Sequence, residues 1–484
     1  MNKPLRRVAL ACLLLFGILL VNANMQQFVL AEDRRNDPKN RRVLLDEYAR
    51  ERGPILVADQ PIASSIPTED ELKYLRQYAA GPLYASVTGY YSFIYGAEGI
   101  EREEREVLAG TDDRLFVRQI GDLLTGESRG GGSVLLTLNA AAQQAAFDGL
   151  QGQKGAVVAL NPQTGAILAM ASNPSYDPNV LATHDGVALQ DSWETLNADP
   201  EKPLLNRALR ETYPPGSTFK IITAAAALSS GDYDTDETQI PAPDVLDLPL
   251  TDAVLPNQGG ASCASDEMIS LRDALRISCN TAFGGLGMAL GPEALQSQAE
   301  RFGFNSTVDV PMTSAESVFP TGINEPQTAQ SAIGQFDVRA TPLQMAMMIG
   351  AIANDGVVMQ PYLVQEERAP DLKPISTAQP EELSEAVSAS VANDLKSMLV
   401  TVVEEGTGTN AQIEGVTVGG KTGTAQTAPG RPPYAWFVAF APAENPTVAV
   451  AVLIEEANVA PDDISGGRLA APIAKAVMEA VLGL

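Results

Sequence analysis

The longest apolar run of the chain lies near its N-terminus. No charged residue occurs from Val8 to Ala31, and these roughly 24 residues are enough helix to cross a hydrocarbon core of about 30 Å. Three basic residues precede the run: Lys3, Arg6 and Arg7. The basic flank predicts a cytoplasmic N-terminus, with residues 1–31 as a single-pass signal-anchor in the cell membrane. A cleaved signal peptide is the alternative, because Val29-Leu30-Ala31 matches a weak cleavage site, but the length of the run favours the anchor.

A more polar region with mixed patterning follows, from Glu32 to Gly132. It opens with a charged segment and continues through a turn and strand from Arg52 to Asp59. A charged helix is predicted from Glu101 to Leu108. The run from Arg129 to Gly132 is typical of a flexible joint. We therefore expect residues 32–132 to form one extracytoplasmic domain and residues 133–484 to form a second.

Beyond the joint, strand-like and helix-like patterns alternate. A strand (134–138), a helix (139–150) and a hairpin (155–171) come first, and Ala- and Leu-rich helices fill the middle. Three more strands and a last helix are predicted near the end: Val416–Thr424, Tyr434–Ala441, Thr447–Glu455 and Leu469–Leu482. Strands at both ends with helices between them predict an α+β fold, in which distant segments form one antiparallel sheet covered by helices. The Pro-rich charged stretch from Glu366 to Glu385 is predicted to be an exposed loop.

Composition narrows the class of protein. Of 484 residues, 45% are hydrophobic and 19% are charged, which is typical of a globular protein of two or three domains. The net charge of −27 argues against nucleic acid and against an anionic membrane surface as partners. The three cysteines are too few for a disulfide scaffold and form no cluster with metal-ligand spacing. We expect neither a metal nor an organic cofactor.

One stretch carries distinctive chemistry, Tyr213-Pro-Pro-Gly-Ser-Thr-Phe-Lys220. The Pro-Pro-Gly turn is followed by an Ala- and Leu-rich run that favours a helix, so Ser217 is predicted at a helix N-terminus with Lys220 one turn on. A lysine amine beside a serine can take its proton. The chain holds one histidine, His184, in a loop-like stretch, so Lys220 is the better candidate base. The alternative is that Ser217 is an ordinary helix cap and Lys220 is solvated.

Two further motifs follow in order. Ser278-Cys279-Asn280 comes just after a predicted helix over 270–277, and Lys421-Thr422-Gly423 lies on a predicted strand. Each of the patterns S-x-x-K, S-x-N and K-T-G occurs once in this chain. A single such motif is an ordinary helix exit or strand end, but the three in this order are far more specific.

With their flanks, these motifs resemble the class B penicillin-binding proteins. The flanking matches are Arg52-Gly53, Asn206-Arg207-Ala208, Tyr213–Gly216, Ile333-Gly334-Gln335 and Thr341–Gln344. The resemblance covers the chain from about Arg52 to its end and is strongest to the short penicillin-binding protein A type of Actinobacteria, which acts in cell division. It implies the serine β-lactamase and penicillin-binding transpeptidase fold, with an N-terminal pedestal domain and a transmembrane anchor.

The resemblance also implies catalytic roles. Ser217 attacks a carbonyl and forms an acyl-enzyme, while Lys220 takes its proton. Ser278 relays that proton to the leaving amine, and Asn280 hydrogen-bonds both Lys220 and the substrate amide. Lys220 must then be neutral part of the time, which burial and a nearby second cation favour.

The K-T-G strand is implied to bind substrate. Lys421 supplies the second cation and, with the hydroxyls of Thr422 and Thr424, suits a substrate carboxylate. Gly423 lets substrate backbone lie close to the strand. Two backbone N–H groups are implied as the oxyanion hole, those of Ser217 and Thr424.

The middle motif departs from the family pattern at one position. The family often carries Asp or another polar residue where this chain has Cys279, and Cys263 lies nearby in sequence. Outside the cytoplasm a disulfide between the two is expected, and it would pin the S-x-N loop. Two buried free thiols are the alternative.

The implied activity is peptidoglycan D,D-transpeptidation. A stem peptide ending in D-Ala-D-Ala acylates the serine, D-Ala leaves, and the amine of a neighbouring stem takes the acyl group during cell-wall synthesis and division. β-Lactam antibiotics would bind the same serine covalently. The glutamate that class A β-lactamases add in an E-x-x-L-N segment has no counterpart after the S-x-N, since the nearest string, Glu194–Asn197, precedes Ser217.

Two other functions are compatible with these residues. One is a β-lactam sensor or a division scaffold without catalytic activity, and the other is a D,D-carboxypeptidase that releases D-Ala without cross-linking. The expected partners are peptidoglycan stem peptides, β-lactams, and division or cell-wall synthesis proteins bound through the pedestal and the anchor.

Overall fold

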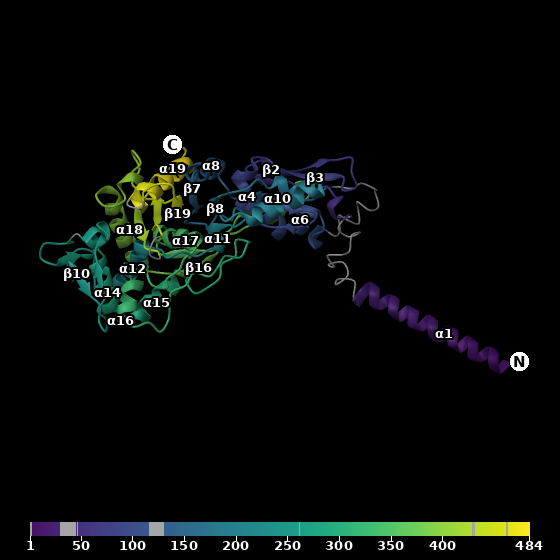
Figure 1. The fold of residues 1–484 in the computed structure, drawn as a ribbon, viewed down its shortest axis with the longest axis horizontal. Helices are drawn as coiled ribbons and strands as arrows, with labels where there is room; N and C mark the ends of the chain where they lie inside the picture. The colour runs from purple at the N-terminus through teal and green to yellow at the C-terminus, as the bar shows by residue number, and fades with distance from the viewer. Residues whose placement is uncertain are drawn as a thin grey trace.

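The computed structural model describes residues 2–29, 45, 47–115, 130–260, 262–427, 431–460 and 463–484. Figure 1 shows two folded units side by side, with the C-terminus in the larger one and a single helix at the N-terminal end. The architecture is α+β, as the sequence predicts.

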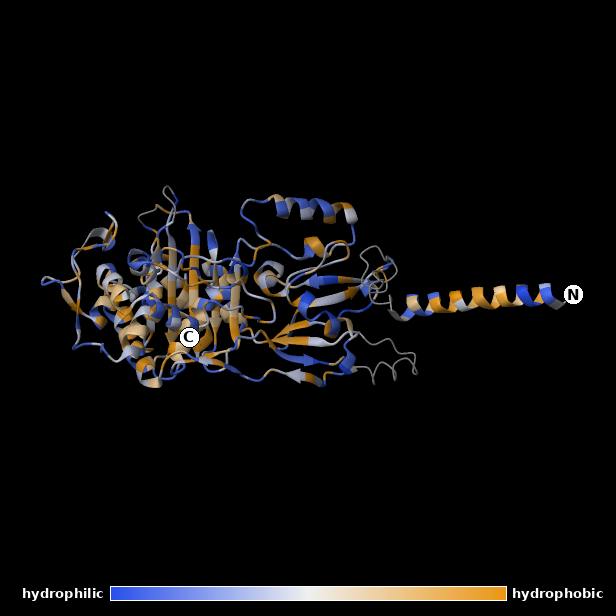
Figure 2. Ribbon diagram, turned by 90° about the horizontal axis from the view of Figure 1, so that it is seen from below, coloured by the Kyte–Doolittle hydropathy of each residue, from blue (hydrophilic) through white to orange (hydrophobic). Residues whose placement is uncertain are grey.

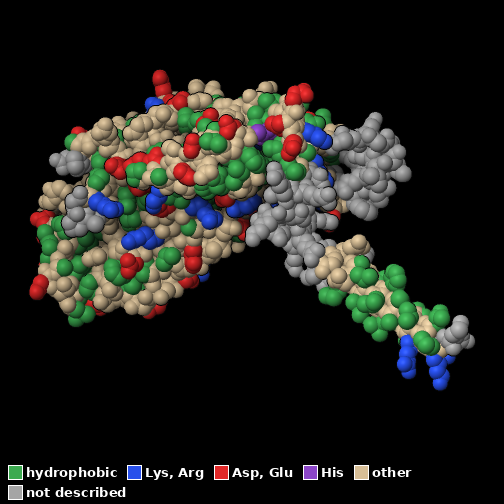
Figure 3. All heavy atoms as spheres, turned by 45° about the vertical axis from the view of Figure 1, so that its right-hand side comes forward, with side chains coloured by type: hydrophobic (Ala, Val, Ile, Leu, Met, Phe, Trp, Pro, Cys, Tyr) green, Lys and Arg blue, Asp and Glu red, His purple; other side chains and the backbone are tan. Residues whose placement is uncertain are grey.

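The N-terminal helix α1 (Asn2–Asn24) continues into a π-helical turn (Met25–Val29). The span Lys3–Gln27, whose most apolar 18-residue window has a mean hydropathy of 2.3, is the one helix among the described residues that is long and apolar enough to cross a membrane. Figure 2 colours most of this helix as hydrophobic, and Figure 3 shows hydrophobic side chains along it and basic side chains near its N-terminal tip. The helix therefore fits a single-pass anchor. Leu30 and Ala31, in the alternative cleavage site, lie outside the described residues.

The smaller unit is built on a six-stranded sheet in the order β15-β14-β6-β1-β2-β3. The strands are β1 (Ile55–Val57), β2 (Gln60–Pro67), β3 (Tyr74–Tyr78), β6 (Ser133–Leu136), β14 (Val364–Arg368) and β15 (Pro374–Thr377). β1 and β6 run parallel, whereas the other neighbouring pairs are antiparallel. A separate N-terminal unit is present, but its sheet extends beyond residues 32–132: β6 and the distant strands β14 and β15 come from residues 133–484, which the sequence predicted to belong to the second domain.

The prediction of a loop from Glu366 to Glu385 is wrong, although most of the segment is exposed, as predicted. The segment holds most of β14, all of β15, and β16 (Glu382–Glu385), which pairs with β13 (Val357–Met359). Val364 and Ile375 pack against the hydrophobic core, and β14 pairs with β6. Prolines and charges indicated a loop, but pairing with a strand far away in the sequence overrides such local preferences.

A buried ionic triad lies under the pedestal helices α4 (Gly81–Thr88), α5 (Ile100–Glu103) and α6 (Arg105–Ala109). The predicted charged helix is broken at Glu104, between α5 and α6. Glu101 is fully buried, and its carboxylate accepts from Arg52 Nε at 2.5 Å and from Arg76 Nε at 2.6 Å. Arg76 also donates to Gly53 O at 2.8 Å. One carboxylate thus neutralises part of the charge of two buried guanidinium groups.

The glycines at the predicted joint are packed. Arg129 lies outside the described residues, but Gly131 and Gly132 are buried, and their N–H groups donate to Glu51 O at 2.7 Å and Val107 O at 2.8 Å. A Cβ on Gly131 would overlap the carbonyl of Leu108. Glycine is needed here for close approach of two backbones, rather than for the flexibility that the sequence suggested.

The larger unit holds the predicted antiparallel sheet, in the order β17-β18-β19-β7-β8. Its strands are β7 (Gln153–Leu160), β8 (Ile167–Asn173), β17 (Gly419–Ala425), β18 (Tyr434–Ala441) and β19 (Val448–Ala457). Alternate residues of β18 enter two different cores, with Phe437 on one side and Trp436 on the other. Segments from both ends of the domain therefore share one sheet, and β17 is an edge strand.

Helices cover both faces of this sheet. α8 (Ala140–Gly149) and α19 (Ala471–Leu482) share one core with it, and α17 (Pro342–Ala353), which is buried along its whole length, shares the other. Figure 2 shows the hydrophobic strands enclosed between the helices. A helical lobe continues from α17: α12 (Lys220–Ser230), α13 (Leu271–Arg276), α14 (Asn280–Leu290), α15 (Pro292–Arg301), α16 (Glu325–Ser331) and α18 (Ala389–Glu404).

Replacing Glu101 with alanine should lower the free energy of unfolding by about 3–5 kcal/mol, because two buried guanidinium groups lose the carboxylate they share. Thermal and denaturant unfolding of the full chain in detergent measure the change. Glu98→Ala is the matched control, since it removes the exposed ion pair with Arg102 and should cost less than about 1 kcal/mol. Equal losses in the two variants would contradict a stabilising role for the triad.

Candidate active site

Ser217 lies in a short 3-10 turn (Gly216–Phe219) that runs directly into α12. Prolines precede the turn and Gly216 has a φ of +55°, so the backbone cannot enter the helix earlier. Trp436 of β18 holds the turn by donating from Nε1 to Pro214 O at 3.0 Å. Ser217 therefore stands at the start of a helix, as the sequence predicts, with its side chain half-buried.

The side chain of Lys220 is fully buried beside this turn. Its Nζ donates to Ser278 O at 2.7 Å and to Asn280 Oδ1 at 2.7 Å, and it lies 3.3 Å from Ser278 Oγ. Two of these three oxygens belong to carbonyl groups, which only accept hydrogen bonds. The S-x-x-K and S-x-N motifs are thus brought together by direct contacts.

A second buried lysine approaches the same hydroxyl from β17. Lys421 Nζ donates to Ser278 Oγ at 2.9 Å and to Thr422 O at 2.9 Å. Ser278 sits in the bend between α13 and α14 with a φ of +64°, which lies in the left-handed region. Its hydroxyl is therefore placed between the Nζ atoms of Lys220 and Lys421.

Burial lowers the pKa of both lysines. Loss of solvation, and then the charge of Lys421, hold the pKa of Lys220 well below its usual value. Burial lowers the pKa of Lys421 to about 7. A neutral Lys220 has two N–H bonds for the two carbonyl oxygens and a lone pair for a hydroxyl, so its hydrogen-bond partners suit a neutral amine beside a charged Lys421.

A pocket of about 580 Å³ opens beside these groups. Ser217, Asn280 and Thr424 line it, and they come from three different elements. Most of the remaining wall is formed by two loops, residues 254–260 and residues 330–336. Because β17 is an edge strand, an extended peptide can lie along it while its carbonyl carbon faces Ser217.

Two residues of the K-T-G motif have partners that the sequence did not indicate. The Thr422 hydroxyl lies 2.6 Å from the hydroxyl of Thr407, and Thr422 is not among the residues lining the pocket, whereas Thr424 is. A Cβ on Gly423 would lie 2.9 Å from Thr218 Cγ2 and 3.0 Å from Pro215 O. Glycine at this position accommodates the turn that carries Ser217, and the approach of substrate to Gly423 stays a prediction.

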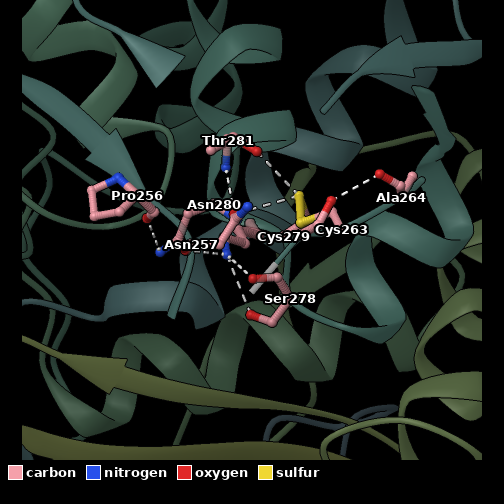
Figure 4. Close-up of a disulfide and its surroundings, with 10 residues drawn as sticks. Pro256, Asn257, Cys263, Ala264, Ser278, Cys279, Asn280 and Thr281 are labelled. Atoms are coloured by element: carbon pink, nitrogen blue, oxygen red, sulfur yellow. Dashed lines mark hydrogen bonds between the residues drawn. A yellow bond between two sulfur atoms is a disulfide. The ribbon is translucent and has the colours of Figure 1, made fainter. Parts of the chain in front are cut away.

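A disulfide joins Cys263 to Cys279, directly before α14 (Figure 4). It ties the start of that helix to the segment after a short hairpin, β10 (Val245–Asp247) and β11 (Val254–Pro256). Nothing in the sequence indicated that this hairpin would form part of the pocket wall, because its short strands carry no motif. The third cysteine, Cys12, is free and exposed on α1.

The other candidate residues lie away from the pocket. His184 Nδ1 is 2.6 Å from Asp70 Oδ2 of the pedestal, and His184 does not line the pocket. Glu194 is on α10 (Gly186–Ala198), where Gln190 donates to it at 2.9 Å. In the part of the chain that the structure describes, no group of three His, Cys, Asp or Glu side chains is placed to hold a metal ion.

Two family models match the chain. Residues 155–479 match the transpeptidase domain of penicillin-binding proteins, and residues 52–134 match the dimerisation domain of penicillin-binding protein A. Among curated proteins, the peptidoglycan D,D-transpeptidase PbpA of Mycolicibacterium smegmatis is 47% identical over 493 positions, covering 100% of this chain and 99% of the relative. The protein of the same name from Mycobacterium tuberculosis H37Rv is 45% identical over the same shares of both chains.

Solved structures give the same match. Penicillin-binding protein A of M. tuberculosis, as a ceftriaxone acyl-enzyme complex, superposes with a TM-score of 0.88 at 44% identity, covering 90% of this chain and 100% of that one. The D,D-transpeptidase domain of a peptidoglycan glycosyltransferase from Eggerthella lenta has a TM-score of 0.78 at 36% identity, over 90% and 99% of the two chains.

Compared with the Lys421→Met variant, the native chain should gain stability as the pH rises from about 7 towards 10. In the folded chain Lys421 loses its proton near pH 7, whereas in the unfolded chain it keeps it to about pH 10.4. Between these values the unfolded state binds more protons, so stability rises with pH by up to about 1.4 kcal/mol per unit, and it is lost as the pH falls.

Denaturant unfolding of the full-length native and variant chains at pH 6, 7.5 and 9 measures this difference. A stability difference that does not change with pH would contradict the lowered pKa of Lys421.

Proposed function

This chain belongs to the penicillin-binding protein transpeptidase family, and on that premise we propose how its residues carry out peptidoglycan D,D-transpeptidation. The enzyme takes the acyl group of a stem peptide onto a serine, releases D-Ala and passes the acyl group to the amine of a neighbouring stem. One observation supports the assignment of residues above all others. The Ser278 hydroxyl lies between Lys220 and Lys421, and Asn280, which accepts from Lys220, lines the same pocket as Ser217.

Acylation begins at Ser217. Its Oγ attacks the carbonyl carbon between the two D-alanines, and its proton passes to neutral Lys220. As the C–N bond breaks, that proton moves through the Ser278 hydroxyl to the leaving amine of D-Ala. Lys421 donates a hydrogen bond to Ser278 Oγ at 2.9 Å, which leaves the hydroxyl hydrogen free to act in this relay. The step ends with an ester on Ser217 and with Lys220 neutral again.

The pocket positions the substrate and the developing charge. We assign the oxyanion hole to the backbone N–H groups of Ser217 and Thr424, both of which line the pocket. Removing one such donor typically costs about 3–4 kcal/mol of activation free energy. The Thr424 hydroxyl and the charge of Lys421 suit the terminal carboxylate, and Thr422 supports them through Thr407. Asn280 holds Lys220 and offers its amide to the peptide.

The acyl-enzyme is expected to persist until an amine arrives. No Asp or Glu is among the described residues that line the pocket, so no carboxylate is at hand there to activate water. This supports transfer to an amine over the fast hydrolysis of a β-lactamase. A D,D-carboxypeptidase, or a β-lactam sensor or division scaffold, remains a weaker candidate for the same pocket.

The pedestal and the anchor support a membrane-bound enzyme with protein partners. We propose that α1 crosses the cell membrane once, with its basic tip in the cytoplasm and both folded units outside. The pedestal matches a domain described as a dimerisation domain, and we propose that it binds a second copy or cell-wall synthesis and division proteins.

Fluorescent penicillin should label the full chain in detergent at Ser217 and should not label Ser217→Ala, because the nucleophile is lost while the fold is kept. Mass spectrometry of the labelled peptide locates the adduct, which we expect to last many minutes. Ser230→Ala, at the exposed end of the same helix, is the control and should label normally. Label retained by S217A would place the nucleophile elsewhere, and an adduct that disappears within seconds would support a hydrolase.

A donor peptide ending in D-Ala-D-Ala, given together with an amine acceptor, then tests the second half of the reaction. Release of D-Ala with a cross-linked product supports the transpeptidase, whereas release without a product supports the carboxypeptidase. A native chain that takes up neither penicillin nor donor would support the scaffold.

Protease added outside intact cells or spheroplasts should digest the folded units and spare the N-terminal tip, because the basic flank stays in the cytoplasm. A tag placed before Lys3 and detected by antibody reports the protected end. A tag that is removed together with the folded units would reverse the proposed orientation.

A further inference from the structure

The helix that carries Asn280 begins without a cap of its own. Cys279 occupies the position before α14, and its side chain makes no capping hydrogen bond. The first N–H groups of a helix have no partner inside the helix and are normally bonded by a side-chain oxygen at this position. Here a residue 22 positions earlier supplies that oxygen. Asn257 Oδ1 accepts from Asn280 N at 2.9 Å and from Thr281 N at 3.1 Å (Figure 4).

Asn257 belongs to the wall of the pocket. It follows β11 directly, and residues 254–260 line the pocket beside Ser217. Asn257 itself is 7% exposed, and its Nδ2 is buried with no hydrogen-bond partner among the described residues. The side chain therefore acts through its oxygen, which faces the start of α14.

Three further contacts fix the same hairpin on α14. Asn280 Nδ2 donates to Pro256 O at 3.2 Å. The disulfide of Cys279 crosses to the segment after the hairpin. Leu255 packs where α14 has a glycine, since a Cβ on Gly284 would lie 2.6 Å from Leu255 Cδ2. The wall of the pocket and the first turn of α14 are thus held as one unit.

The contacts of Asn280 join this unit to the catalytic lysine. Its amide accepts from Lys220 through Oδ1 at 2.7 Å and donates to the hairpin through Nδ2. A helix start that moves by a fraction of an ångström displaces Oδ1, and it also displaces the Ser278 hydroxyl two residues earlier.

We propose that Asn257 is a positioning residue for the transpeptidase reaction, which caps α14 from another segment and so holds Asn280 and Ser278 in place on Lys220. The inference rests on the proposed function, because it gives the three residues their roles. Through this cap, contact between substrate and the hairpin wall would also affect the positions of the proton-transfer groups, Lys220 and the Ser278 hydroxyl.

Two substitutions distinguish the effect of the capping hydrogen bonds of Asn257 from the effect of the size of its side chain. Asn257→Leu keeps the size and removes the oxygen. Asn257→Asp keeps an oxygen for both N–H groups, and it adds a negative charge that a helix N-terminus favours. Among the described residues, Lys421 is the charged group that faces Lys220, and its charge lowers the pKa of Lys220. A new carboxylate at position 257, beyond Asn280, would oppose this effect and raise the pKa of Lys220.

The test measures the rate of acylation by fluorescent penicillin across pH 5 to 9, with the full chain in detergent. N257L should react about 5- to 30-fold more slowly. This is the range expected if the transition state loses the stabilising free energy of one helix cap. It should still label Ser217 to the same final extent. N257D should react within about threefold of the native rate at its best pH, with the acidic limb of its profile moved to higher pH. Leu250→Ala, at the exposed tip of the hairpin, is the control for general disturbance of this segment.

Three outcomes would overturn the proposal: N257L at the native rate, N257D as slow as N257L, or N257D with an unmoved acidic limb. Where N257L does not fold, Asn257→Ser takes its place, because its hydroxyl is too short to reach either N–H group and the same slow rate is expected. Failure of the proposed function is distinct from all of these, since the native chain would then not be labelled at Ser217.

Discussion

Two buried lysines that share one serine hydroxyl set the conditions for the rest of this structure. The Nζ atoms of Lys220 and Lys421 lie 3.3 and 2.9 Å from Ser278 Oγ, and neither lysine is exposed. Two ammonium groups this close in a poorly solvated site repel each other strongly, so one of them must give up its proton. The fold therefore has to exclude water, bring three elements together within hydrogen-bonding distance, and still leave Ser217 open to a peptide.

Each of these requirements depends on contacts between distant parts of the chain. Lys220 meets Ser278 across 58 residues, and Lys421 meets it across 143. The sheet that positions Lys421 needs β7 and β8 from the start of the larger unit as well as β17 to β19 from its end. The two units are also interlocked, because β14 and β15 leave the larger unit and complete the pedestal sheet. The site forms only when nearly the whole chain after α1 has folded.

This dependence explains how much the sequence could predict. Residues whose chemistry is needed in a fixed order, such as Ser217, Lys220 and Asn280, can be recognised without knowing their neighbours. So can periodic patterns, and the long apolar N-terminal helix and the antiparallel sheet were correctly predicted from them.

Residues whose role depends on a distant partner carry no such mark. Glu366 to Glu385 has the composition of a loop and still forms strands, because β6 is available to pair with it. Gly423 suggested an approaching substrate, but its neighbour is the Ser217 turn. Asn257 belongs to no motif at all. These contacts form only in the folded chain, so the sequence does not show them without the three-dimensional structure.

The molecule accommodates buried cations in two opposite ways. The contrast explains why several contacts hold the residues of the active site in place. In the pedestal, Arg52 and Arg76 are buried with Glu101, which neutralises part of their charge and accepts a hydrogen bond from each. Among the described residues no carboxylate lines the pocket or bonds to the two lysines, and a carboxylate beside Lys220 would raise its pKa and remove the proposed base. The site therefore destabilises the folded state, and other contacts must offset that cost. The disulfide before α14, the cap from Asn257 and the packing on Gly284 all converge on the first turn of that helix, where a small displacement would separate Asn280 and Ser278 from the lysines they control.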